Sequence, residues 1–111
     1  MSHEKRDTII LKKVLSEIAD IEAFVTEMTD EDFCTTKIAQ KAVTMSLINI
    51  GELSKSFSEA FLDETKQIPW RDIRGLRNLP AHHYEGIDMN DLWHTIQNDV
   101  PALKSALTAI G

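Results

Sequence analysis

The chain has 111 residues, 42% of them apolar, and 18 acidic against 12 basic residues give a net charge of −6. This length suits one core, so residues 1–111 are interpreted as a single domain. Four glycines and three prolines are too few for a turn-rich β sandwich or a disordered chain, and the single cysteine, Cys34, excludes an intrachain disulfide.

The acidic balance argues against a dedicated nucleic-acid-binding protein, which normally carries an excess of basic residues. Any contact with a polynucleotide must therefore come from a local basic cluster, or else the acidic surface serves a basic protein partner. The N-terminus lacks the apolar stretch of a signal peptide, and no window approaches the run of about 18 apolar residues of a membrane span. We therefore expect a cytoplasmic protein.

Two long amphipathic helices are predicted in the first half of the chain, over residues 4–28 and 35–57, because apolar residues recur there every three or four positions. Residues 29–32 between them are typical of a break with capping residues. Gly51 lies inside the second helix, where glycine is costly unless a neighbouring backbone approaches closely. Glu52 is predicted to be half-buried, as the partner of an arginine from another helix.

A polar connection over residues 58–68, with one short turn, is predicted to lead into a third helix over residues 70–78. Pro69 suits the first turn of that helix. Pro80 should end or kink it, because proline cannot donate to the helix and disfavours the helical conformation at Leu79.

A last helix is predicted to start near Met89. Either Pro101 bends this helix, or Asp99 caps the start of a new helix that has Pro101 in its first turn. These elements together predict the all-α class, with an antiparallel bundle of four or five helices.

Residues 71–88 concentrate the side chains that suit phosphodiester chemistry. Arginines follow at three-residue steps, and two imidazoles and a phenol come shortly after them. A guanidinium can hold a phosphate, and an imidazole can move a proton to or from an attacking 2′-hydroxyl or a leaving oxygen. No metal or other cofactor is required if RNA supplies its own nucleophile. The side chains concerned are Arg71, Arg74, Arg77, His82, His83 and Tyr84.

The spacing of these residues raises a question of geometry. Arg77 and His82 are five residues apart, which separates them by about 140° on an ideal helix, whereas Arg77 and Tyr84 would align on an unbroken one. Arg77 and His82 can meet if Pro80 redirects the chain, or if the site is assembled across the interface of a two-fold dimer.

The segment from Arg77 to Tyr84 resembles the R-x4-H-x-Y motif of HepT-like proteins, a group of the HEPN superfamily. The likeness continues in Ile50-Gly51-Glu52-Leu53, in residues 68–78 and in residues 93–101, and so covers nearly the whole chain. Pro80 departs from the aliphatic residue of the family at that position. R-x4-H alone is a weak signal, but in this setting the motif is specific.

The resemblance implies a dimeric HEPN-like bundle that acts as a metal-independent endoribonuclease. On matching positions, Arg77 and His82 are the expected catalytic residues, and Asn78, Glu52 and Arg74 form the supporting pocket. It also implies the toxin half of a type VII-like toxin–antitoxin system. The expected partners are a second copy of the chain, an RNA substrate and an MntA-like minimal nucleotidyltransferase antitoxin, which silences the toxin by transferring AMP to Tyr84.

Two other functions stay open. One is a non-catalytic helical module that partners a nucleotidyltransferase and presents substrate to it, which the net charge and Pro80 favour. The other is a structural bundle that has lost activity.

Individual residues also have plainer interpretations. The two histidines suit the polar end of a helix, an interpretation we keep for His83, and Tyr84 suits the rim of a core. Arg71 and Arg74 are expected as ion-pair partners of Asp72, Glu52 or Glu85. His94 is expected to be structural or solvent-facing. A zinc site from His82, His83 and a carboxylate is discounted, since adjacent histidines rarely converge on one ion.

Overall fold

A computed structural model of the chain describes residues 3–79 and 88–110. Within these two ranges the backbone is helical or in short connections, with no strand, which confirms the predicted all-α bundle. The predictions for His82, His83, Tyr84 and Glu85, and for the direction of the chain at Pro80, lie outside the described residues.

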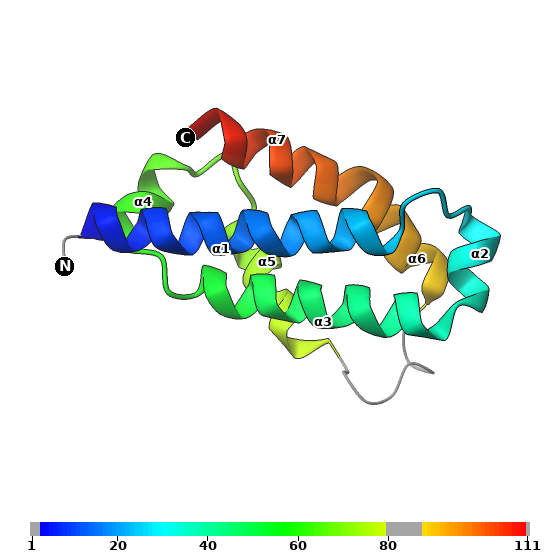
Figure 1. The fold of residues 1–111 in the computed structure, drawn as a ribbon. Helices are drawn as coiled ribbons and strands as arrows, with labels where there is room; N and C mark the ends of the chain where they lie inside the picture. The colour runs from blue at the N-terminus through cyan, green and yellow to red at the C-terminus, as the bar shows by residue number, and fades with distance from the viewer. Residues whose placement is uncertain (1–2, 80–87, 111) are drawn as a thin grey trace.

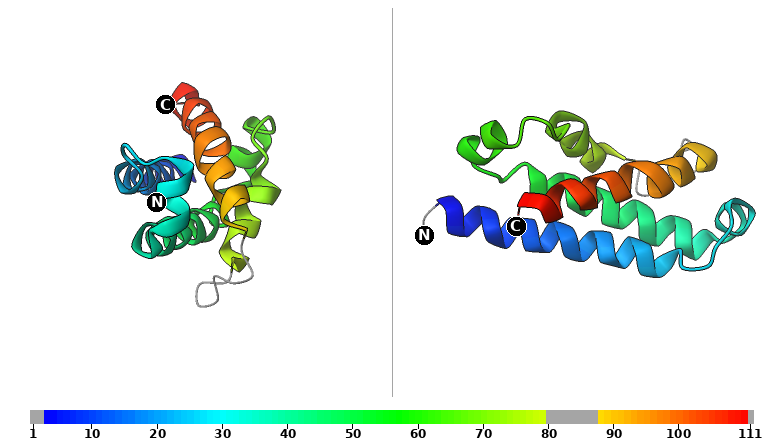
Figure 2. Two further views of the ribbon diagram at one scale, coloured as in Figure 1. Left: turned by 90° about the vertical axis from the view of Figure 1, so that its right-hand side faces the viewer. Right: turned by 90° about the horizontal axis from the view of Figure 1, so that it is seen from above.

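The body of the bundle is a pair of long antiparallel helices, α1 and α3, which run side by side (Figure 1). Their facing sides are apolar, and Val14, Ile21 and Ile50 are fully buried there. A third layer of helices from the second half of the chain covers this pair, as the end-on view in Figure 2 shows. The elements are α1 (His3–Phe24), α2 (Asp30–Thr35), α3 (Lys37–Ser54), α4 (Glu59–Glu64), α5 (Trp70–Gly75), the 3₁₀ turn η1 (Leu76–Asn78), α6 (Met89–His94), the π-helical segment η3 (Thr95–Asp99) and α7 (Val100–Ile110).

The connection between the two long helices contains a short helix that the apolar pattern did not predict. Thr29 and Asp32 form a reciprocal capping box, in which each side chain accepts a hydrogen bond from the other's backbone N–H. The capping residues were therefore predicted correctly. They cap the start of α2 and do not merely separate the two long helices. The second long helix, α3, follows α2 and begins at Lys37. It ends at Ser54, so it lies inside the expected residues 35–57.

The short helix α4 forms an aromatic support for α5. Phe57 stacks on Phe61 with ring centroids 4.3 Å apart, and the ring of Trp70 packs against both. The indole Nε1 of Trp70 donates a 2.8 Å hydrogen bond to Thr65 Oγ1, so the ring is buried with its polar atom satisfied. The start of α5 is thereby anchored in the core.

The last helix starts where the sequence predicts, with Asp88 accepting hydrogen bonds from the backbone N–H groups of Asn90 and Asp91. It runs without a break into α7 through a π-helical segment that ends two residues before Pro101. A proline in a helix removes one donor and crowds the carbonyl four residues earlier, and a wider turn accommodates both effects. The helix is thus distorted beside Pro101 and does not restart at Asp99.

None of the described helices combines the length and the apolar character that crossing a bilayer requires.

Candidate active site

The candidate site lies where α5 and η1 cross α3. Residues 70–78 are helical, as predicted, with an α-helical first part and a 3₁₀ last turn that carries Arg77 and Asn78 on the surface. Leu79 then takes an extended conformation, φ −60° and ψ 138°, which a residue preceding proline favours. The helix therefore ends at Asn78, and Arg77 and Tyr84 do not share one unbroken helix.

Gly51 sets the position of this turn against α3. A Cβ atom at Gly51 would lie 2.5 Å from the backbone nitrogen of Arg77 and 3.0 Å from the carbonyl oxygen of Ile73. Real Cβ contacts are essentially never as short as the first of these distances. The close backbone approach expected from a mid-helix glycine is thus present, and the backbone that touches Gly51 is that of Arg77 itself.

Glu52, the next residue on α3, lies beside the same turn. Its side chain is 49% exposed, so the predicted half-buried position is wrong, and its ion-pair partner is Lys55 of its own helix, with Nζ 2.8 Å from Oε2. The predicted arginine partner from another helix is therefore wrong as a direct contact. The hydrogen bond from Lys55 has the largest effect and lowers the pKa of Glu52. Desolvation opposes it and is the second-largest effect, and the positive charges of Lys55 and then Arg77 lower the pKa further.

The three arginines of α5 and η1 follow one another at three-residue steps and form a row along the segment. Arg71 and Arg77 are exposed, and Arg74 is half-buried. Within residues 3–79 and 88–110, none of the three is within ion-pair distance of a carboxylate. The expected pairs of Arg71 or Arg74 with Asp72 or Glu52 are therefore not formed, and the third expected partner, Glu85, lies outside the described residues.

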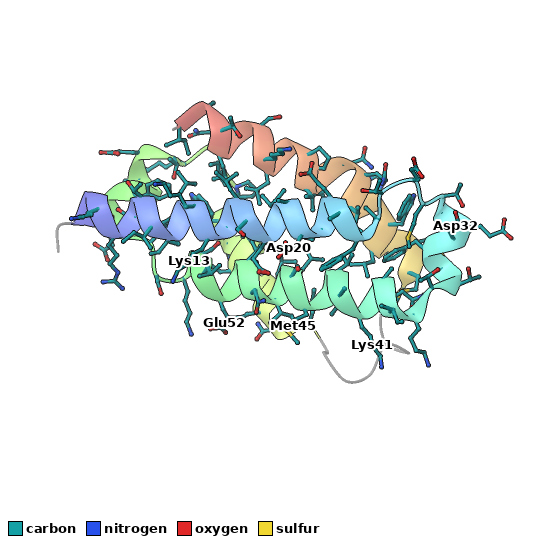
Figure 3. The ribbon with its side chains drawn as sticks, viewed as in Figure 1. Lys13, Asp20, Asp32, Lys41, Met45 and Glu52 are labelled. Atoms are coloured by element: carbon teal, nitrogen blue, oxygen red, sulfur yellow. The ribbon has the colours of Figure 1, made fainter. Side chains whose placement is uncertain are left out.

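An open groove of about 540 Å³ adjoins Glu52 between α1 and α3. Lys13 of α1 and Glu52 of α3 border this side of the helix pair in Figure 3. Asn49 Nδ2 donates a 3.2 Å hydrogen bond to Glu17 Oε1 across the groove. The sequence did not single out Lys13 or Glu17, because helical periodicity predicts which face of α1 is buried but not which residues of α3 lie opposite. The lining residues are Lys13, Ser16, Glu17, Asn49, Glu52, Leu53, Lys55 and Ser56.

Other candidate residues lie away from this turn or outside the described ranges. His94 is exposed and its Nδ1 lies 3.1 Å from Asn98 Nδ2, which confirms the expected solvent-facing position. No group of three or more histidine, cysteine or acidic side chains among the described residues is arranged to hold a metal ion. His82 and Tyr84, the other predicted functional residues, are outside those residues.

Comparisons with known proteins identify the family of this chain. Residues 14–110 match the family described as Ribonuclease HepT-like. The "Probable ribonuclease HepT" of Thermococcus cleftensis is 39% identical over 97 residues, covering 84% of this chain and 88% of that protein. The "Putative RNase MJ0127" of Methanocaldococcus jannaschii is 38% identical over 91 residues, covering 82% of this chain and 75% of that protein.

A third relative, "Putative RNase MJ1380" of the same archaeon, is 32% identical over 107 residues, which are 96% of this chain and 98% of that protein. No solved structure matches significantly. The family match covers nearly the whole chain and includes the helix-ending turn that carries Arg77. The chain belongs to the HepT-like ribonuclease family of HEPN proteins.

Proposed function

We propose that this protein is a metal-independent RNA endonuclease in which Arg77 and His82 are the catalytic residues. The match to the HepT-like ribonuclease family supports this class of activity, and so do the names of the relatives, which describe them as ribonucleases. Arg77 binds the scissile phosphate, and His82 transfers protons. Asn78, Glu52 and Arg74 complete the pocket around them.

The environment of Arg77 carries this proposal. Its backbone is held against Gly51 of α3, its side chain is exposed, and no carboxylate among the described residues pairs with it. A guanidinium fixed at its base and free of an ion pair is suited to bind a phosphate through two parallel hydrogen bonds.

The chemistry needs only these groups and the substrate. The ribose 2′-hydroxyl attacks the adjacent phosphorus, the bond from phosphorus to the 5′ oxygen breaks, and the products are a 2′,3′-cyclic phosphate and a 5′-hydroxyl. His82 accepts the 2′-hydroxyl proton or delivers one to the leaving 5′ oxygen, and water completes the other proton transfer. Arg77 offsets the negative charge that grows on the phosphate oxygens in the transition state.

The proposed active unit is a homodimer. Arg77 is on η1, the helix ends at Asn78, and Leu79 is extended, so the helix that carries Arg77 does not continue toward His82. A second subunit across a two-fold axis offers one route by which Arg77 of one copy meets His82 of the other. Redirection of the chain at Pro80 offers the second route, within one subunit.

Regulation is proposed to act through Tyr84, two residues after His82. An MntA-like nucleotidyltransferase antitoxin would transfer AMP from ATP to its hydroxyl, with release of pyrophosphate. The added phosphate places bulk and negative charge close in sequence to the arginine that must bind RNA phosphate. In this scheme the free protein is the toxin of the pair.

The net charge of −6 favours one alternative, a non-catalytic module that partners a nucleotidyltransferase. Cleavage of total cellular RNA and tRNA by purified protein in EDTA separates the two functions. We expect the wild type and Tyr84→Phe to cleave, and Arg77→Ala and His82→Ala to lose cleavage. No cleavage by wild-type protein whose mass shows Tyr84 free of AMP would favour the binding module.

A further inference from the structure

The row of Arg71, Arg74 and Arg77 is a local concentration of positive charge on an acidic protein. Three of the four arginines of the chain lie within these seven residues, while the net charge of the whole is −6. Like charges at three-residue spacing on a helix repel each other, by about 0.2–0.5 kcal/mol for each pair. No carboxylate among the described residues offsets this repulsion by pairing with an arginine. A cluster of like charges that forms no ion pair among the described residues is typical of a binding surface.

The row is carried on a rigid support. Trp70 and Ile73, one residue before Arg71 and Arg74, are buried, so the apolar side of α5 is fixed in the core while the arginines follow on the adjacent side. The hydrogen bond of Trp70 to Thr65 anchors the start of the row, and the contact with Gly51 anchors its end. Binding groups on such supported elements lose little conformational freedom when a ligand binds.

We propose that Arg71 and Arg74 bind phosphates of the RNA strand next to the phosphate bound by Arg77. This inference rests on the proposed ribonuclease function and deepens it, because it assigns the arginines beyond the motif to substrate binding. Three residues of helix advance by about 4.5 Å, so three long guanidinium side chains follow one another along the segment. A single strand of RNA presents phosphates in succession, and a row of guanidinium groups can bind them without reading the bases.

The charge distribution favours RNA over an acidic protein surface as the ligand of this row. The third arginine of the row is the proposed catalytic residue, so a ligand that covers the row must reach the reaction centre. A strand of RNA does so as substrate, and its affinity gains from each neutralised phosphate. The remainder of the surface is acidic on balance and repels RNA, which confines the strand to this segment.

The test is binding of a short, fluorescently labelled, single-stranded RNA with 2′-O-methyl groups, which the proposed reaction cannot cleave. Binding constants are measured against salt concentration for the wild type, Arg71→Gln, Arg74→Gln and the two lysine variants of the same arginines. We expect each glutamine variant to weaken binding several-fold and to lower the slope of log K against log salt by about 0.7. The lysine variants keep the charge and should keep most of the slope.

Lys12→Gln and Lys66→Gln are matched controls, since each removes one exposed positive charge outside the row. Both should bind with the wild-type salt slope. Thermal unfolding of every variant separates a structural role from a binding role. Glutamine variants that lose stability but keep the wild-type salt slope would overturn the proposal.

The outcomes distinguish this inference from the proposed function. In one outcome the wild-type protein cleaves RNA, and Arg71→Gln and Arg74→Gln bind RNA with the same salt slope as Lys12→Gln and Lys66→Gln. This outcome would overturn the proposed phosphate row and leave the proposed ribonuclease function intact. Wild-type protein that neither binds nor cleaves RNA would overturn both. If the glutamine variants bind RNA normally and lose binding only to the nucleotidyltransferase, the row serves a protein partner and the inference is wrong.

Discussion

Gly51 connects the fold of this protein with its proposed chemistry at the scale of a single residue. In most helices a glycine at an interior position lowers stability by about 1 kcal/mol relative to alanine. Here the missing side chain lets the backbone of η1 approach α3, with the backbone nitrogen of Arg77 only 2.5 Å from the position that a Cβ atom would occupy. The position of Arg77 therefore depends on a residue of a different helix.

Gly51→Ala should lower the free energy of unfolding by about 1–3 kcal/mol, because the new methyl group meets backbone atoms that cannot move independently. Chemical denaturation with urea measures this change. Gly75→Ala is the matched control, since a Cβ atom there meets nothing within 4 Å and the backbone is already helical. Its free energy of unfolding should stay the same or rise by up to about 1 kcal/mol. Equal effects of the two substitutions would contradict the close approach at Gly51.

A second contact at the scale of single residues is the ion pair of Glu52 with Lys55, and the titration of Glu52 tests it. Its pKa is lowered first by the hydrogen bond from Lys55 and then by nearby positive charge, so the carboxylate keeps its charge to a lower pH than an isolated glutamate. Stability from these interactions is present above the ordinary pKa of the carboxyl group and is lost as the pH falls through the lowered value.

Lys55→Gln should raise the pKa of Glu52, and Arg77→Gln should raise it by a smaller amount, as followed by NMR of the side-chain carboxyl. Lys66→Gln, a surface substitution outside the site, serves as the control and should leave the titration unchanged. A pKa of Glu52 that does not respond to Arg77→Gln would place the guanidinium beyond electrostatic reach of α3.

At the scale of the elements, Asp7 ties the first helix to the start of α4. The carboxylate is buried and accepts two hydrogen bonds from Ser58, one from the backbone N–H at 2.9 Å and one from the hydroxyl at 2.6 Å. The same hydroxyl accepts a bond from the N–H of Phe61 and so caps α4. Since Phe61 packs against Trp70, this network supports the start of α5.

Asp7→Ala should therefore lower the free energy of unfolding by about 1.5–3 kcal/mol, because hydrogen bonds to a charged acceptor are lost and the donors of Ser58 remain partly buried. Asp20→Ala, an exposed substitution on the same helix, should change it by no more than about 0.5 kcal/mol. Urea denaturation of the two variants provides the comparison. A loss for Asp7→Ala no larger than for Asp20→Ala would show that the network contributes little.

The sequence predicted the element boundaries that are determined by residues close to them. Pro69, Pro80 and Asp88 act within one or two residues, so the ends of α5–η1 and the start of α6 were predictable. The short helix α2 was missed because it carries only one buried apolar residue, Phe33, and so has no periodic pattern.

The candidate site was predictable only in part. The need for a close neighbour at Gly51 follows from glycine alone, but the identity of that neighbour as Arg77 requires the packing of two helices. Glu52 pairs with Lys55 instead of an arginine because both side chains are exposed, so a lysine of the same helix can compete for the carboxylate. The groove between α1 and α3 depends on the register of the two helices, which periodicity does not determine.

At the scale of the whole molecule, the described residues form an elongated bundle of 44 × 26 × 22 Å. The crossing of η1 with α3 lies along the length of this bundle rather than at its acidic end, where Asp30, Glu31 and Asp32 begin α2 (Figures 1 and 3). Under the proposed function, an RNA strand that approaches the bundle is attracted to the arginine row and repelled by α2. This separation reconciles a net negative charge with a proposed polyanionic substrate.

The most direct measurement is the rate of RNA cleavage in EDTA by wild-type protein, Gly51→Ala, Gly75→Ala and Arg77→Ala, at a temperature where all four are folded. We expect Gly75→Ala to cleave like the wild type and Arg77→Ala to lose cleavage. Gly51→Ala should fall by about 100-fold, because displacing a catalytic group by about 1 Å has an effect of that size. Folded Gly51→Ala or Arg77→Ala protein that cleaves at the wild-type rate would contradict the claim that α3 positions Arg77 for catalysis.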